Sequence, residues 1–268
     1  TKELLKLLNL FEKHQIPAIT YKGAALTAAM YGNLSFRQFG DLDILVQPQD
    51  FSRAKELLIS QGYHPESKFE WEESLINNKT KVNVDLHKRI APKYFPLLLD
   101  FDGLWQRLEP VSLIGTTVTT LCTEDLLIIL TMQIAKDSWE QEQKLSQICD
   151  IAELIRSHQQ LDWGKIIKQA KSLGSERMLL VSLLLAKDIL EAKLPAEIEQ
   201  RLQGDRLIKL LAAKLRKWLF DSSGSMSEKV QKLFFFPFGI RERLQDKINY
   251  GRRLTYLSYL GIKNRVQG

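Results

Sequence analysis

This sequence has little cysteine, and it lacks the patterns of disulfide-rich, zinc-binding, membrane-spanning and secreted proteins. The 268 residues include only Cys122 and Cys149, too few for a disulfide framework and wrongly spaced for a zinc site. We expect both to be buried thiols. The sequence has no uninterrupted apolar run of about 18 residues, and its amino end lacks a basic segment followed by an apolar one. We therefore expect a cytoplasmic protein without membrane contact.

The composition is that of a soluble globular protein, with 44% hydrophobic and 26% charged residues. The net charge of +6 is unevenly distributed. Residues 201–268 hold 15 Lys and Arg against 5 Asp and Glu, whereas the preceding 200 residues hold 23 against 27. A basic carboxyl part attracts nucleic acid or other phosphate-rich ligands, but the same charges are also typical of a solvated helical face. Both interpretations stay open on the sequence.

The first 120 residues or so mix patterns of helices and strands. Apolar periodicity, turn residues and caps predict helices, strands and a hairpin turn in this part of the chain. The expected helices are 2–14, 24–30, 51–61 (with Asp50 as N-cap) and 97–108, and the expected strands are 18–21, 41–46, 68–76, 80–87 and a pair within 111–121.

From Thr123 onward the pattern is helical only. The expected helices are 124–136, 140–157, 162–172, 176–192, 197–220 with a break at Gly204, and 241–259. The Ser/Gly stretch 221–227 is the clearest candidate linker, and the aromatic cluster 234–238 is more typical of a core plug than of a base-stacking platform. We expect an α+β domain over 1–121 and a helical domain with a basic carboxyl part over 122–268.

Two aspartates at the start of one apolar strand are the sharpest chemical feature. Because strand side chains alternate, Asp41 and Asp43 share one face while Leu42, Ile44 and Val46 share the other. Two adjacent carboxylates repel unless a cation lies between them, and Mg²⁺ prefers such hard oxygen ligands. A lone pair of this kind is a weak signal, since capping and turn aspartates are common.

A third carboxylate belongs to the second strand of the expected hairpin. Val82, Val84 and Leu86 alternate with polar residues, so Asp85 and His87 lie on the polar face. If this strand pairs beside residues 41–46, three carboxylates can hold two metal ions that clamp the attacking and leaving oxygens of an in-line phosphoryl transfer. Alternatively, Asp85 is an exposed carboxylate without a metal, and His87 is a solvated side chain.

Basic residues precede the aspartates. Lys22 and Gly23 lie at a strand-to-helix transition, where glycine allows close backbone approach and a helix start offers free N–H groups to a phosphate. Arg37 precedes Asp41 by four residues and is a candidate to hold the triphosphate. Lys22 as an ordinary surface lysine and Arg37 as a structural partner of an aspartate are the alternatives.

These motifs, in this order and spacing, resemble the bacterial nucleotidyltransferase family of the DNA polymerase β superfamily, with its KGA, R-x-x-x-D-hydrophobic-D and DLH pattern. The resemblance covers about residues 1–120 by motif and the helical remainder more loosely. It is carried by Tyr21-Lys22-Gly23-Ala24-Ala25-Leu26, Tyr31-Gly32, Arg37, Asp41-Leu42-Asp43-Ile44-Leu45-Val46 and Val84-Asp85-Leu86-His87. Ala24 in place of a serine and Lys88 in place of an aromatic depart from the pattern.

The resemblance implies a nucleotidyltransferase-type mixed sheet with flanking helices, followed by an all-helical domain. It implies that Asp41 and Asp43 are metal ligands and that Asp85 is the third ligand or the base, with Lys22 and Gly23 against the nucleotide phosphates. The expected activity is transfer of a nucleoside monophosphate from an NTP, with Mg²⁺ or Mn²⁺, to an acceptor that is a small molecule, a protein or an RNA end. The alternative is a catalytically idle fold that binds nucleic acid or a protein.

The aspartates also allow an expectation about variants. If Asp41 and Asp43 are partly exposed metal ligands, replacing either with alanine abolishes turnover and leaves the fold intact.

Overall fold

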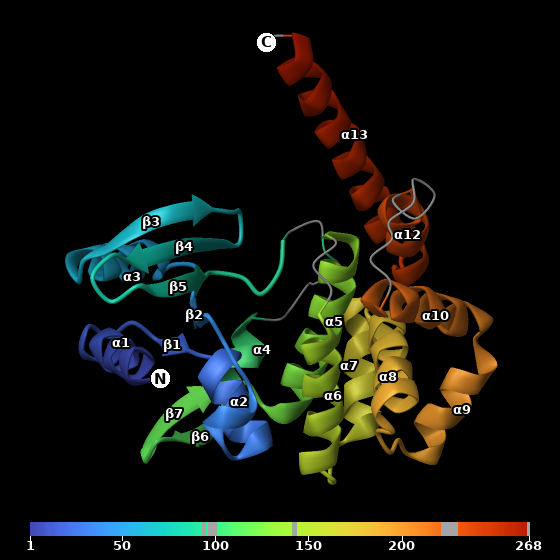
Figure 1. Ribbon diagram of the computed structural model, residues 1–268, viewed down its shortest axis with the longest axis horizontal. Coiled ribbons are helices and arrows are strands. Elements are labelled where there is room, and N and C mark those ends of the chain that lie inside the picture. Colours follow the sequence, from blue (N-terminus) through green and yellow to red (C-terminus); the bar gives the residue numbers. More distant parts are fainter. Residues whose placement is uncertain (93–94, 96–100, 141–143, 221–229, 267–268) are drawn as a thin grey trace. The chain divides into compact units, whose positions relative to one another are not determined.

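The computed structural model describes residues 1–92, 95, 101–140, 144–220 and 230–266 (Figure 1). The chain divides into two compact units, the first formed by Thr1–Lys93 with Leu99–Leu126 and the second by Tyr94–Leu98 with Leu127–Gly268. The first contains all the strands of the described residues, so the predicted α+β class is confirmed. The domain limits 1–121 and 122–268 stay a prediction, because compactness does not establish independent folding.

A five-stranded mixed sheet with the order β1-β2-β5-β4-β3 forms the centre of the first unit. The central pair, β2 and β5, is parallel, and the other three pairs are antiparallel. The condition set by the sequence, that the strand carrying Asp85 pairs beside the strand carrying Asp43, is therefore met. The strands are β1 (Ala18–Ile19), β2 (Asp41–Val46), β3 (Tyr63–Lys68), β4 (Glu72–Asn77) and β5 (Val82–His87).

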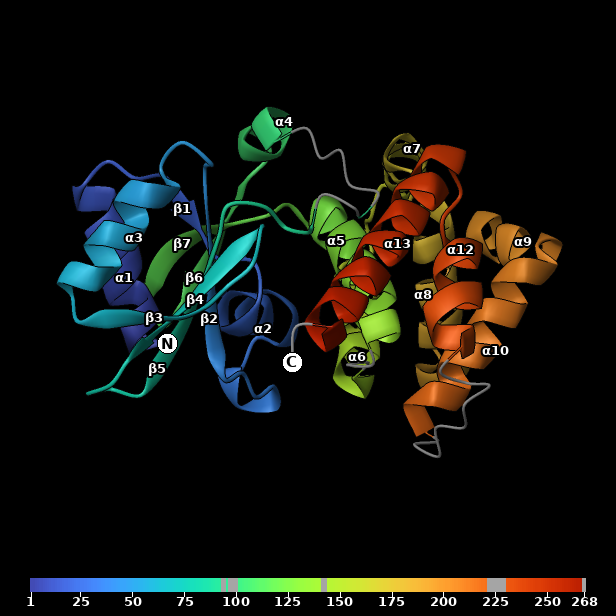
Figure 2. The same cartoon turned by 90° about the horizontal axis from the view of Figure 1, so that it is seen from above.

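One face of this sheet is apolar and is covered by α1 (Lys2–Lys13) and α3 (Phe51–Ser60), while α2 (Gly23–Tyr31) lies on the other side (Figure 2). The buried side chains shared by the helices and the sheet form one core, as the alternating pattern predicted. Its members include Leu4, Leu7, Phe11, Leu42, Ile44, Val46, Ala54, Leu58, Val84 and Leu86. The polar side chains of β2 and β5 are thereby left on the opposite face.

The edge strand β3 differs from the prediction, which placed a strand at 68–76 and none at 63–67. Its sequence, Tyr-His-Pro-Glu-Ser-Lys, is mostly exposed and lacks apolar alternation. Pro65 lies where the pairing with β4 shifts register, which is one of the few places that a sheet tolerates proline. The turn between β4 and β5 was predicted correctly, and Asn77 Oδ1 there accepts hydrogen bonds from the amides of Lys79 and Thr80.

Smaller elements complete the first unit. A 3-10 turn, η1 (Leu34–Phe36), follows α2, and the predicted strand pair near residue 115 is β6 (Glu109–Leu113) and β7 (Thr116–Thr120), which form a separate antiparallel sheet. Helix α4 (Phe101–Gln106) is shorter than the predicted 97–108, of which residues 97–100 lie outside the described residues.

Helices form the second unit, as predicted. Helix α5 crosses from the first unit into the second, and the break expected at Gly204 separates α9 from α10. The candidate linker 221–227 lies outside the described residues. The bounds are α5 (Thr123–Glu140), α6 (Leu145–Ser157), α7 (Trp163–Leu173), α8 (Glu176–Leu190), α9 (Ala196–Gly204), α10 (Arg206–Phe220), the π-helical turn η2 (Gln231–Phe235), α12 (Phe236–Ile240) and α13 (Leu244–Val266).

The aromatic cluster 234–238 is only partly a core plug. Phe236 is fully buried and its ring meets Trp218 edge-on at 5.4 Å, whereas Phe234 and Phe235 are 47% and 41% exposed. The two thiols divide similarly, since Cys122 is buried and Cys149 is half-buried, and both are free. Each helix within the described ranges is too short or too polar to cross a lipid bilayer.

Candidate active site

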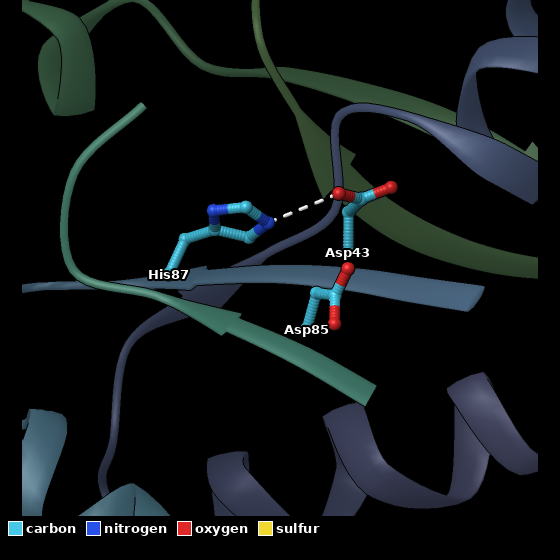
Figure 3. Close-up of side chains that lie close together, drawn as sticks. All are labelled: Asp43, Asp85 and His87. Carbon is cyan, nitrogen blue, oxygen red and sulfur yellow. Dashed lines mark hydrogen bonds and ion pairs between the residues drawn. The ribbon is translucent and has the colours of Figure 1, made fainter. Parts of the chain in front are cut away.

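The parallel pairing of β2 with β5 brings the predicted carboxylates together. Asp43 lies directly opposite Asp85 in the register, and Asp41 lies opposite Asn83. Side chains directly opposite each other on neighbouring strands point to the same face. Figure 3 shows the carboxylates of Asp43 and Asp85 on this polar face, with the imidazole of His87 beside them.

Asp43 is buried and meets two basic groups. Lys22 Nζ and His87 Nε2 each lie 3.0 Å from the same carboxylate oxygen, Oδ1. Within the described ranges, Oδ2 of Asp43 accepts no hydrogen bond. Burial alone would raise the pKa of Asp43, but Lys22 first and His87 second outweigh it and hold this pKa well below its usual range. Asp43 is therefore an anion whose charge Lys22 and His87 balance.

His87 lies between two carboxylates. Its Nε2 faces Asp43, and its Nδ1 lies 3.0 Å from Oε2 of Glu72, the residue opposite His87 on β4. The ring is 2% exposed, and Tyr21 packs edge-on against it with 5.8 Å between ring centroids. Burial lowers the pKa of His87, but the contacts with Asp43 and Glu72 outweigh burial and raise it above its ordinary value. The imidazole is thus part of the site, not a solvated side chain.

Asp85 has a different environment from Asp43. It is half-buried, and Oδ1 accepts a 2.6 Å hydrogen bond from Ser74 Oγ on β4. Burial raises the pKa of Asp85, and the neighbouring charge of Asp43 adds to this, while the Ser74 bond opposes it. The two facing carboxylates are therefore pushed in opposite directions, with Asp43 the stronger acid.

Lys22 and Gly23 lie beside the cluster. Lys22 is the residue before α2, and its contact with Asp43 outweighs the burial of the ammonium and raises its pKa. Gly23 begins the helix with φ of +52°, a left-handed conformation that disfavours any side chain. A Cβ on Gly23 would lie 3.6 Å from the Asp41 carbonyl oxygen, an ordinary contact. Backbone conformation rather than lack of space therefore calls for glycine here.

Asp41 and Arg37 lie on the segment that leads into the site. Asp41 is the first residue of β2 and is half-buried. Arg37 follows η1 in an extended conformation and is also half-buried. The roles expected for both at metal and nucleotide stay predictions.

Three side chains of the described residues fit a metal ion. Asp43, Asp85 and His87 each offer one ligand atom, and these atoms all lie within 4.8 Å of one another. Two buried or half-buried carboxylates on one sheet face form the hard oxygen donor set that Mg²⁺ or Mn²⁺ takes in proteins. The donors thus fit a divalent cation, with His87 in the group where the sequence had suggested Asp41.

The sequence interpretation missed three residues of this site. Glu72 contacts His87, Ser74 bonds Asp85, and Tyr21 packs on the His87 ring. Glu72 and Ser74 alternate on the strand before Asp85, so the hairpin places them on the polar face. Finding them needed the register that joins Asn77 to Val82, which sequence alone does not fix.

Solved structures to which this chain is similar include LnuA, ANT(2″)-Ia and a protein from Paracoccidioides brasiliensis. Lincomycin-bound LnuA, a lincosamide antibiotic adenylyltransferase, is 18% identical, with 57% of this chain and 94% of that chain covered and a TM-score of 0.42. ANT(2″)-Ia in complex with adenylyl-2″-tobramycin is 12% identical, with 65% and 97% covered and a TM-score of 0.46. An antigenic nucleotidyltransferase-like protein from Paracoccidioides brasiliensis is 15% identical, with 66% and 90% covered and a TM-score of 0.39. No curated protein matches the chain.

Similarity to those structures is too low to assign an activity, so the family rests on the sequence itself. Residues 1–191 match the family described as uncharacterised nucleotidyltransferase. This stretch includes the whole cluster of Lys22, Asp43, Asp85 and His87. The resemblance in the motifs is thereby confirmed, and the chain belongs to this nucleotidyltransferase family.

Proposed function

We propose that this chain transfers a nucleoside monophosphate from an NTP to a hydroxyl, phosphate or amine acceptor and releases pyrophosphate, in a reaction that depends on Mg²⁺ or Mn²⁺. The observation that carries the proposal is the pairing of Asp43 with Asp85 across parallel strands, with Lys22 Nζ 3.0 Å from Asp43. Two carboxylates and a lysine on one polar face suit a site for a metal-bound triphosphate.

Asp41, Asp43 and Asp85 are the proposed metal ligands. Bound divalent cations would neutralise phosphate charge and stabilise the attacking and leaving oxygens. Asp43 is best suited to the central position, because its carboxylate stays ionised and within the described ranges its Oδ2 accepts no hydrogen bond. Asp41 enters from the start of the same strand.

Asp85 is also the proposed acceptor of the proton that leaves the attacking group. Without a bound cation, burial and the charge of Asp43 raise the pKa of Asp85, so this carboxylate is a better base than an ordinary aspartate while it does not bind the metal. The Ser74 hydrogen bond fixes one oxygen and leaves the other for the substrate or a metal. Because Ser74 holds Oδ1, the remaining oxygen, Oδ2, would serve in one of the two roles at a time, ligand or base.

Lys22 is the proposed phosphate ligand. In the absence of nucleotide its ammonium neutralises Asp43. When cations compensate the carboxylates, Lys22 is repelled by them and is attracted to the triphosphate. The backbone N–H groups at the start of α2, which begins at Gly23, favour anions at the same place. Arg37 is the proposed partner of the leaving pyrophosphate.

Thermal melting of the purified protein tests this proposal. Each of the four NTPs is added with and without Mg²⁺, and stabilisation that needs both components supports a metal-nucleotide site and identifies the base. At about 100 times the dissociation constant, a ligand that binds only the folded state adds about 2.7 kcal/mol. Asp85→Asn is the matched variant, since Asn keeps the shape of Asp85 and removes the charge.

Two results would contradict the proposal. One is an unchanged melting temperature with every NTP at saturating Mg²⁺ and also at saturating Mn²⁺, and the other is equal NTP turnover in wild type and Asp85→Asn. Salt-dependent binding of RNA or DNA without any NTP turnover would instead favour the idle fold that acts as a binding module, with the basic residues 201–268 as its contact. If the melting test instead supports the proposal, acceptors are screened with the NTP that raises the melting temperature most.

A further inference from the structure

The distance between His87 and Asp43 fits two ligands of one ion as well as it fits the hydrogen bond between them. Two donors bound at right angles to a cation, each about 2.1 Å away, lie about 3.0 Å apart. Nε2 of His87 and Oδ1 of Asp43 are 3.0 Å apart, and one ligand atom of Asp85 lies within 4.8 Å of both. Small side-chain rotations therefore bring all three groups around a single ion.

The other ring nitrogen has the surroundings of a metal-bound histidine. Metal-ligating histidines almost always present their second nitrogen to a carboxylate, carbonyl or water, which fixes the tautomer and the ring orientation. Nδ1 of His87 lies 3.0 Å from Glu72 Oε2, close enough for an ion pair, although the ring is not turned far enough toward this oxygen for a hydrogen bond. Tyr21 packs against the ring. The side chain is 2% exposed, so its orientation is set by these neighbours and Nε2 points at the carboxylates.

Charge balance supports the same conclusion. The groups that face His87 are the anions Asp43, Glu72 and Asp85 and the cation Lys22. A histidine that merely fills a core needs no such set of carboxylates around it. Lys22 shares Oδ1 of Asp43 with His87, so its proposed transfer to the triphosphate makes room for an ion at this oxygen.

We propose that His87 is a direct ligand, together with Asp43 and Asp85, of one of the divalent cations, with Glu72 as its outer partner. The assignment of His87 rests on the proposed function, and it also indicates which ion the site prefers. Imidazole nitrogen favours first-row transition ions over Mg²⁺, which prefers oxygen alone. The site therefore selects Mn²⁺ or a later transition ion such as Co²⁺ in preference to Mg²⁺.

Electron spin-echo spectroscopy of bound Mn²⁺ detects the proposed bond directly. The sequence contains only four histidines, and His14, His64 and His158 lie outside the cluster. The protein with these three changed to Gln and with ¹⁵N-histidine incorporated carries the label at His87 alone. Mn²⁺ is added together with a non-hydrolysable NTP of natural isotopic composition, so that Lys22 can leave Oδ1 of Asp43, and coupling of the electron spin of Mn²⁺ to ¹⁵N is the expected result. Bound Mn²⁺ without this coupling overturns the proposal.

Metal competition gives a second, independent readout. In wild type, Mg²⁺ is expected to displace Mn²⁺ only at a large excess, and His87→Gln should lower the affinity for Mn²⁺ by about tenfold or more while changing that for Mg²⁺ less. Glu72→Gln should weaken Mn²⁺ binding by about 10- to 100-fold, the usual effect of losing an outer partner. His64→Gln, on an exposed edge-strand residue, is the matched control and should change neither affinity.

The outcomes separate this inference from the proposed function. If Mg²⁺ and NTP stabilise the protein but His87→Gln leaves the Mn²⁺ to Mg²⁺ preference unchanged, the inference fails and the nucleotidyltransferase proposal stands. If neither ion binds in the presence or absence of NTP, both fail. The labelled protein with native His87 gives its answer even if His87→Gln does not fold.

Discussion

At the scale of single residues, the site depends on the balance of charge around Asp43. Lys22 is 19% exposed and Asp43 only 7%, so their pair is screened little by water. Such a pair stabilises little compared with apolar packing, but the loss of one partner leaves the other charge buried and uncompensated. Asp43 and Asp85 should therefore differ sharply in what their removal does to the fold.

Asp43→Asn is expected to destabilise the metal-free protein by about 3 kcal/mol, because it leaves Lys22 and His87 without their shared anion. Asp85→Asn is expected to leave stability unchanged or slightly higher, since burial and Asp43 already disfavour its charge. Both variants should lose turnover. Urea unfolding in EDTA measures the difference, and equal stability of the two variants would contradict this account.

This corrects the expectation that Asp43 can be removed without harm to the fold. That expectation assumed that both aspartates are partly exposed. Asp41 is half-buried, but Asp43 is buried. Alanine at Asp41 is therefore the better activity probe of the two.

The metal-free protein should lose stability as the pH rises above about 6.5, the ordinary histidine pKa. His87 has a raised pKa in the folded state, so its contribution is complete below the unfolded pKa and is lost as the pH rises through the folded pKa. Urea unfolding of wild type and His87→Gln in EDTA, from pH 6 to pH 9, measures the contribution. The difference in the free energy of unfolding between wild type and His87→Gln should shrink with rising pH. A difference that stays constant would contradict the raised pKa of His87.

At the scale of elements, the turn into α2 places Lys22 and the helix start beside β2. The turn depends on the left-handed backbone of Gly23. This conformation costs a residue with a side chain about 1–2 kcal/mol. The ordinary contact distances around Gly23 mean that this cost is conformational, not steric.

Gly23→Ala should accordingly lower the free energy of unfolding by about 1 kcal/mol and weaken NTP binding, because the helix start and Lys22 shift together. Gly204→Ala is the control, since Gly204 ends α9 with open space around it and without a left-handed φ. It should be neutral or slightly stabilising. Chemical denaturation and NTP-dependent melting measure both effects. A Gly23→Ala protein as stable as wild type would show that the turn tolerates a side chain.

At the scale of the whole molecule, the chain consists of two compact units. The proposed metal and nucleotide ligands all belong to the first, which contains residues 1–93 and 99–126. The basic surplus belongs to the carboxyl part, where α10 buries Ile208, Leu211 and Leu215 along one side. A solvated charged face and a contact for phosphate-rich ligands remain the two interpretations of that surplus.

Hydrogen exchange with and without NTP and Mn²⁺ should distinguish the two units. The largest gain in protection is expected in peptides that contain the start of α2, β2 and β5, because ligand binding stabilises the unit that holds the site. If the peptides of α6 to α10 gained as much protection from exchange as those of the first unit, a nucleotide site built from the first unit alone would be contradicted. The Asp85→Asn protein is the control and should show the smaller gain.

The sequence predicted the carboxylates of the site better than it predicted the surrounding elements. Alternation predicted that Asp41 and Asp43 share one face and that Asp85 lies on the polar face of its own strand. The parallel pairing of β2 with β5 then met the condition for bringing them together. Strand β3 was missed, because an exposed edge strand with proline has no apolar period to detect. The aromatic cluster was half right, because burial of each ring depends on which neighbours pack against it.

The sequence by itself determined the α+β class and the helical second half, and it selected the carboxylates with Lys22 and Gly23 as candidate site residues. Local periodicity, turn chemistry and motif spacing are properties of neighbouring residues, so they can be read without the fold. Only the tertiary structure decided that Asp43 faces Asp85 and that His87 lies between Asp43 and Glu72. These contacts join residues up to 44 positions apart. They depend on strand order and register, which are set when the apolar face of the whole sheet packs under α1 and α3.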